Sequence, residues 1–567
     1  MKLDQLSPDH VALRRPETVM RLARMGSFHQ SRLSFMRVLL RRLKSENWRF
    51  ERRAFEIDAR GVGHAVYTMH GPARSYSLVA FAQDLAPEQR SDRVIATAWD
   101  ATFTLFDGLP SAADIARLSR NVPLQEAGRV TARELTVSRA NRSVRLFDHV
   151  VDCLSRGEQP EAGRVDEVGY LMRTTAVYGS GKLGAADRES ICDRPEFAAP
   201  FQAEMLTVFL IRGFVLDLVE HLAALRGGDR AVALDPSLRR RIGIGNSTGL
   251  GMAPFLLNHP ILLNNWIEAR ETALARIRAL PAISPAEAAA FRVMLRRGRR
   301  NIDDWHSEHP IQRDKISGLK ADLDRLDAHV ESGALEGASP WDRLYLWSET
   351  ALGLEGQELL VALMMEPYGA LVDDLPMRMS ADESAGFRID GGMSVARLRD
   401  ILERDYAWVL GIDWNSPEAQ ARAWYVSAEK LEPRLGERHL EPVAAYEQPL
   451  APGRDAALLF AALGREASDA RVADFLLRHP EHRHILRRVQ IAARHPYAEI
   501  RDNTVGAEVL PIDLLRAKLS FFGACHFDPR SDRWVRINMF RNAPFPHELA
   551  EMEFAGWTYP ALPEALS

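Results

Sequence analysis

The sequence is poor in cysteine and has no long run of hydrophobic residues. Its 567 residues include three cysteines, which are too far apart to form a disulfide framework or a thiolate zinc site: Cys153, Cys192 and Cys525. This usage is typical of a reducing compartment. The most apolar stretch, residues 205–222, is interrupted by Arg212, Asp217 and Glu220, so it is too charged to span a bilayer.

The sequence also lacks an excess of positive charge and an apolar leader. The net charge is −4, which excludes the broad cationic surface that binds a nucleic-acid backbone. The first ten residues, MKLDQLSPDH, contain no apolar segment of a secretory signal. We therefore expect a cytoplasmic protein that has neither a nucleic-acid nor a membrane partner.

Lysine is scarce although basic residues are plentiful. Of the 73 basic residues seven are lysines, which leaves 66 arginines (73 − 7). Codon bias in a GC-rich genome accounts for such a preference and says little about mechanism. It does make each lysine conspicuous, and Lys182 lies in the most unusual stretch of the chain.

The spacing of apolar residues predicts one helix followed by a group of strands. Between residues 28 and 44, apolar side chains recur every three or four positions, which is the period of an amphipathic helix. The period then changes to two, and turn clusters separate four predicted strands at 47–58, 62–69, 76–83 and 93–107. Beyond residue 111 the pattern is helical, apart from a strand predicted at 534–540. We therefore predict an α+β fold, predominantly α-helical, with one small antiparallel β-meander near the N-terminus.

Changes in composition divide the chain into four predicted units. The first helix and the meander occupy residues 1–108, and a helical domain with two glycine-rich loops occupies 109–340. The polar stretch ESGALEGASP at the end of this domain is the strongest linker candidate. A helical segment with a loop-rich end follows at 341–450, and a helical and mixed unit completes the chain at 451–567.

The first glycine-rich segment runs from Arg173 to Gly184 and contains three glycines and Lys182. Glycines allow successive backbone N–H groups to converge on an anion, and a lysine adds a point charge. The segment is not a Walker A loop, because alanine and leucine stand where that loop needs glycine and a hydroxyl residue. We predict an anion site to which Lys182 contributes, with Arg173, Ser180 and Arg188 as substrate-binding residues. The alternative is a plain glycine turn with an exposed lysine.

The second glycine-rich segment, residues 243–251, holds four glycines around Asn246, Ser247 and Thr248. An apolar run begins at Met252, so we predict a loop before a helix N-terminus, which suits a carboxylate or phosphate. These three polar residues are then substrate-binding candidates. Two alternatives stay open, namely helix capping by a hydroxyl and a variant of the dinucleotide fingerprint, although three arginines precede the segment where a buried strand should stand.

A predicted helix at about 201–225 separates the two glycine-rich segments and carries Asp217, Glu220 and His221. Asp217 and His221 are four positions apart, so both side chains share a helix face. A carboxylate that orients an imidazole is a common arrangement for a general base, and we therefore name Lys182, His221 and Asp217 as catalytic candidates. The alternative is a solvated rim on an otherwise buried helix.

Other patterns are weaker. The histidines between His479 and His484 are interrupted by an arginine, and we predict no metal site there or elsewhere in the chain. Glu355, Glu358 and Glu366 surround one helix, where paired acids can perform general acid–base work but exposure explains them equally well.

The leading hypothesis is an intracellular enzyme that acts on a small anionic metabolite held by the two glycine-rich loops, with metal-independent acid–base chemistry. The alternatives are a non-catalytic interaction or regulatory protein and an NAD(P)-dependent oxidoreductase, although no cofactor is favoured. The sequence leaves the reaction, the substrate and homo-oligomerisation open. What distinguishes these hypotheses is whether both loops and a titratable residue surround one pocket.

Overall fold

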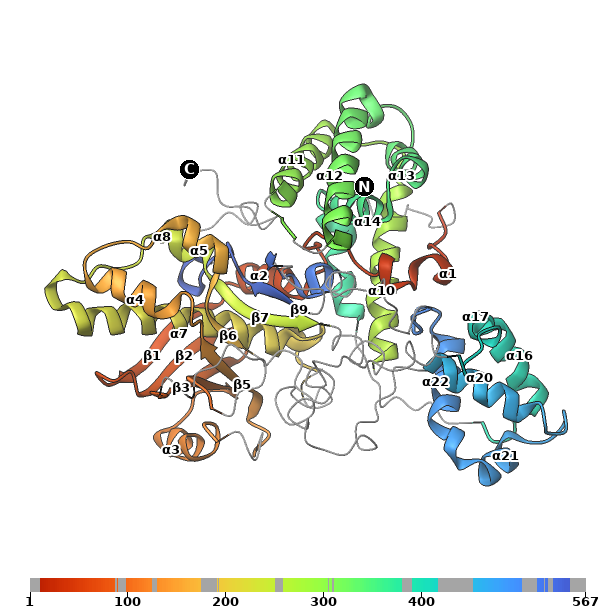
Figure 1. Cartoon of the computed structure of the whole chain (residues 1–567), viewed down its shortest axis with the longest axis horizontal. Coiled ribbons are helices and arrows are strands. Elements are labelled where there is room, and N and C mark those ends of the chain that lie inside the picture. Colours follow the sequence, from red (N-terminus) through yellow and green to blue (C-terminus); the bar gives the residue numbers. More distant parts are fainter. Residues whose placement is uncertain are drawn as a thin grey trace.

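The computed structural model describes most of the chain. It covers the following residues: 11–86, 89, 98–124, 130–174, 191, 193–249, 259–303, 305–307, 310–379, 390–416, 452–501, 516, 518–524, 526–528 and 534–550. Within these residues the chain forms a curled sheet, a helical layer and a small helical unit, which lie at the left, the top and the lower right of Figure 1.

The sheet contains nine strands in the order β1-β2-β3-β4-β5-β6-β7-β9-β8. All neighbouring strands are antiparallel except β6 and β7, which are parallel. The strands are β1 Arg49–Ile57, β2 Gly63–His70, β3 Ser75–Ala82, β4 Ala101–Asp107, β5 Glu134–Arg142, β6 Tyr170–Thr174, β7 Gly243–Gly249, β8 His526–Asp528 and β9 Trp534–Met539.

The predicted fold class is therefore wrong. The four strands expected from the period of two correspond to β1–β4, but they form only part of a larger, mixed sheet that also takes strands from the middle and the end of the chain. The chain is nevertheless substantially helical. The second glycine-rich segment, expected as a loop, forms strand β7 over residues 243–249. The division of the chain into four units stays a prediction.

Helix α7, Gln202–Gly227, packs on the inner face of the curled sheet against β2 to β7. Its apolar side chains join those of the strands, because alternate strand residues such as Leu78 and Phe103 point toward it. The outer face is covered by α3, Ala112–Asn121, through Leu118. Other elements around the sheet are α2 Phe35–Ser45, α4 Phe147–Ser155, α5 Ala162–Val168, η6 Pro195–Phe197, η7 Gly228–Arg230, α8 Pro236–Arg241, η12 Lys518–Phe522 and η13 Pro546–Glu548.

The helical layer surrounds α10, Pro260–Arg278, and shares one hydrophobic core with the sheet. The polar stretch expected as a linker connects α12 to α13 inside this layer. The remaining elements of the layer are α1 Pro16–Val19, η3 Leu22–Arg24, α11 Pro285–Asp303, α12 Pro310–His329, η8 Val330–Ala334, α13 Pro340–Ala351, α14 Leu354–Met364, α15 Gly369–Val372 and η9 Leu375–Arg378.

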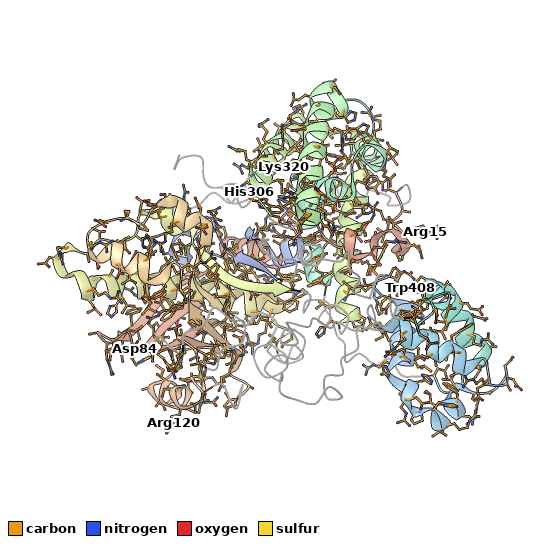
Figure 2. The ribbon with its side chains drawn as sticks, viewed as in Figure 1. Arg15, Asp84, Arg120, His306, Lys320 and Trp408 are labelled. Carbon is orange, nitrogen blue, oxygen red and sulfur yellow. The ribbon has the colours of Figure 1, made fainter. Side chains whose placement is uncertain are left out.

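The small helical unit has its own core of buried side chains. It meets the helical layer where Ile491 and Ala498 contact Ile261. Its elements are α16 Val395–Asp405, α17 Ala407–Leu410, α20 Pro452–Leu463, α21 Val472–Arg478, η11 Pro480–His482 and α22 Arg483–Arg494. Figure 2 marks the three parts by labelled side chains: Asp84 and Arg120 beside the sheet, His306 and Lys320 in the helical layer, and Trp408 in the small helical unit.

Candidate functional site

The two glycine-rich segments of the sequence begin at neighbouring strands. The first follows β6, which ends at Thr174, and the second starts inside β7. Because β6 and β7 are parallel neighbours, their carboxyl ends lie at the same edge of the sheet. The side-chain Nδ2 of Asn246, in the middle of β7, donates a hydrogen bond of 3.0 Å to the carbonyl oxygen of Thr174, which joins the end of β6 to β7.

The amino end of α7 lies at this same edge. Thr174 pairs with Ala140 of the antiparallel strand β5, so β6 is directed along β5 toward Thr136. The hydroxyl of Thr136 lies 2.8 Å from the hydroxyl of Thr207, which belongs to the second turn of α7. The β6–α7–β7 crossover thus brings two strand carboxyl ends and a helix N-terminus together, which is the arrangement that binds ligands in α/β folds. We call this place the β6/β7 edge.

Several buried polar residues lie near the β6/β7 edge. Ser138 and Thr174 exchange a hydroxyl hydrogen bond of 3.1 Å, and both side chains are almost completely buried. Arg173 and Asn246 are also buried, with 8% and 4% of their surface exposed. The hydroxyl pairs satisfy one another, so they stabilise the interior as well as making this edge polar.

Helix α7 begins at this edge without a side-chain cap. Its N-cap residue, Phe201, has φ of 58° and ψ of 19°, and the Phe201 side chain provides no capping hydrogen bond. Left-handed backbone is a genuine outlier for a bulky residue. The partial positive charge of the helix N-terminus is therefore not masked by the N-cap side chain.

The structure brings some of the predicted substrate-binding residues together. Arg173 and Asn246 lie at the β6/β7 edge. Ser247 and Thr248 are part of β7, although their side chains are outside the described part. Three further candidates lie outside the described residues: Ser180, Lys182 and Arg188.

The predicted catalytic pair on α7 is not assembled as a pair. Asp217 Oδ2 accepts hydrogen bonds from the Tyr67 hydroxyl at 2.8 Å and from Arg52 at 3.0 Å. His221 Nε2 instead lies 2.9 Å from the carbonyl oxygen of Ile57. Each side chain thus anchors α7 to a different part of the β1–β2 hairpin. The partner of His221 Nε2 is a backbone carbonyl rather than the Asp217 carboxylate.

Two glycines of the second segment are explained by packing inside the sheet. A Cβ atom on Gly245 would lie 2.6 Å from ring atoms of Tyr170 on β6, so the ring rests on the bare backbone of β7. A Cβ atom on Gly243 would lie 2.5 Å from the carbonyl oxygen of Met539 on β9. These glycines lie inside a strand, whereas the dinucleotide fingerprint places them in the turn after one. These two glycines therefore do not match the dinucleotide fingerprint, which was the basis of the NAD(P)-dependent oxidoreductase hypothesis.

The burial of acidic residues on and after α14 was not predicted from the sequence. Glu358 is buried beside Arg14, whose Nη1 lies 2.8 Å from its Oε1, and beside Arg270. Burial raises the pKa of Glu358, but Arg14 and Arg270 outweigh it and bring this pKa to about 2. Glu355 pairs with Arg516. These carboxylates are counter-ions of buried arginines rather than members of an exposed rim, and their partners lie between 88 (358 − 270) and 344 positions away in the chain.

Glu366 belongs to a second network of the same kind. Arg37 binds both of its oxygens, at 2.6 and 2.7 Å, and His29 Nε2 lies 2.8 Å from Oε1. Burial raises the pKa of Glu366, but Arg37 and the hydrogen bond from His29 outweigh it and bring this pKa to about 2. Burial lowers the pKa of His29, so the imidazole is neutral near pH 7.

Comparisons of the chain with family models, with curated proteins and with solved structures found no match. Within the described residues, no group of three or more histidine, cysteine or acidic side chains could hold a metal ion. The helices in that part of the chain are also too short or too polar to cross a membrane.

Proposed function

We propose that the protein binds a small anionic molecule, a carboxylate or a phosphate, at the β6/β7 edge. The observation that carries the proposal is the β6–α7–β7 crossover, which places the N-terminus of α7 beside the carboxyl ends of two parallel strands. Backbone N–H groups and the helix dipole at such a place favour a negative charge.

Arg173 and Asn246 support the same proposal. The guanidinium of Arg173 adds positive charge at the end of β6, in a buried position where a charge-assisted hydrogen bond is stronger than in water. Asn246 ties the end of β6 to the middle of β7 through its hydrogen bond to the Thr174 carbonyl oxygen. The proposal concerns binding, and it assigns no proton transfer to His221, because the His221 Nε2 is hydrogen-bonded to the carbonyl oxygen of Ile57 rather than to Asp217.

Isothermal titration with inorganic phosphate and a panel of small carboxylates tests this proposal. Arg173→Met should weaken binding of the best ligand by about 1.5–3 kcal/mol, the contribution of a hydrogen bond to a charged group. Arg142→Met is the matched control, because Arg142 is a buried arginine of β5 that pairs with Met172, on the amino-terminal side of Arg173 in β6. Equal losses in both variants, or no binding of any anion by the unaltered protein, would contradict the proposal.

A further inference from the structure

A second group of charges lies between α2 and the segment around α15. Arg32, which precedes α2, binds Asp373 through two hydrogen bonds of 2.8 and 2.7 Å. Arg37 binds Glu366 in the same two-pronged way. Arg41 follows one turn later on α2, and its Nη2 lies 3.3 Å from Asp373 Oδ1. We call these five residues the α2 arginine cluster.

Positive charge exceeds negative charge in this cluster. Three arginines face two carboxylates, and His29 adds no charge because burial lowers its pKa. The adjacent Asp374 does not correct the imbalance, because it is itself shared by Arg276 at 2.9 Å and Arg378 at 2.8 Å. With these neighbours included, five arginines face three carboxylates among the described residues, an excess of two positive charges.

Arg41 is the arginine whose charge is least compensated. Its Nη2 donates to the carbonyl oxygen of Arg32 at 2.9 Å, and the carboxylate of Asp373 that it approaches is already bound by Arg32 on both oxygens. Its Nη1 is buried and has no hydrogen-bond partner among the described residues. Burial lowers the pKa of Arg41 to about 9, and Asp373 does not restore it. A buried N–H without an acceptor and a cation without its own counter-ion both favour a bound anion.

We propose that the α2 arginine cluster is a second anion site, in which a phosphate group pairs with Arg41. The side chain of Arg41 keeps 15% of its surface exposed and that of Asp373 keeps 33%, so part of the cluster is in contact with solvent, although Arg41 Nη1 itself is buried. A guanidinium binds two oxygens of one phosphate through parallel N–H groups, which is why arginine is suited to this anion. The site is independent of the β6/β7 edge, since it is formed by α2 and the α15 segment.

Titration of the protein with inorganic phosphate at pH 7.5 and constant ionic strength, with sodium chloride as the reference salt, tests this site. Arg41→Met should weaken phosphate binding at least tenfold. Asp373→Asn should strengthen it severalfold, because the phosphate then no longer competes with a fixed carboxylate. Arg278→Met should leave the affinity unchanged, because Arg278 is similarly buried but has its own carboxylate, Asp342, at 2.7 Å.

Several outcomes would overturn the second site. Phosphate that binds no better than chloride excludes it, and so does unchanged affinity in both Arg41→Met and Asp373→Asn. Loss of phosphate binding in Arg173→Met but not in Arg41→Met assigns the anion to the β6/β7 edge and rejects the α2 arginine cluster. Loss in Arg41→Met alone supports the cluster whatever becomes of the β6/β7 edge. The melting temperature of each variant without phosphate identifies any change that comes from unfolding.

Discussion

Replacement of Gly245 by alanine distinguishes a glycine needed for packing from a glycine needed for a ligand. The new Cβ atom would meet the Tyr170 ring at 2.6 Å, and three ring atoms lie within 2.8 Å of it. Tyr170 is buried, so its ring has little room to retreat. Overpacking of this kind costs about 1–3 kcal/mol, and we expect Gly245→Ala to lower the free energy of unfolding by that amount.

The same substitution at Gly213 provides the control. Gly213 lies in the middle of α7, and a Cβ atom there has no other heavy atom within 4 Å. Alanine in a helix interior is favoured over glycine, so Gly213→Ala should stabilise the protein by about 0.5–1 kcal/mol. Urea unfolding followed by circular dichroism measures both changes.

A double variant tests whether the Tyr170 ring causes the loss of stability in Gly245→Ala. If the Tyr170 ring is the obstacle, Gly245→Ala should have almost no effect, within about 0.5 kcal/mol, in a Tyr170→Leu background. If Gly245→Ala leaves the free energy of unfolding unchanged in the unaltered background but weakens ligand binding, the Tyr170 ring is not the reason for glycine at this position. That result would return the glycine to the role that the sequence alone suggested.

Two further predictions concern buried charges. The folded-state pKa of Glu358 and of Glu366 is about 2, below the ordinary value of 4.5, so the stability that these carboxylates contribute is present above pH 4.5 and is lost as the pH falls toward 2. In Glu366→Gln, the melting temperature should fall less steeply as the pH decreases from 4.5 toward 2. At pH 7 this substitution should cost about 3–5 kcal/mol of folding stability, because Arg37 loses its counter-ion. An unchanged dependence of the melting temperature on acid pH would contradict the lowered pKa of Glu366. Arg212 is fully buried in α7 and donates to the carbonyl oxygens of Ile242 and Ala543, each at 2.7 Å. Arg212→Met leaves both acceptors unpaired and should cost about 2 kcal/mol or more in urea unfolding, whereas an unaltered midpoint would show that other donors replace it.

The first part of the sheet could be predicted from the sequence because its strands pair with their nearest neighbours along the chain. Strands β1 to β3 are joined by short turns and alternate apolar and polar residues, so local pattern and final structure agree. Strands β6 and β7 could not be predicted in this way. β6 has five residues, and β7 owes Gly245 to the Tyr170 ring on β6 and Gly243 to the backbone of β9, so its composition resembles that of a loop.

The candidate site shows the same limit. The sequence singled out Arg173 and Asn246, and the parallel pairing of their strands explains why these two residues from distant segments lie close together. It could not show that Asp217 binds Tyr67, nor that Glu366 binds Arg37, because those partners are set by tertiary packing over 150 and 329 positions. A pair spaced four apart on a helix shares a face, but the neighbouring strands decide which partner each side chain meets.

The position of β9 beside β7 has a consequence for synthesis of the protein. Ile244 pairs with Met539, 295 positions later (539 − 244), so the ribosome completes β7 long before its partner exists. At about 5–20 residues per second, this interval lasts roughly 15–60 s. During that time one edge of β7 presents free N–H and C=O groups, which can pair with another nascent chain. Pairing with β9 therefore covers this edge of β7 and ends its exposure.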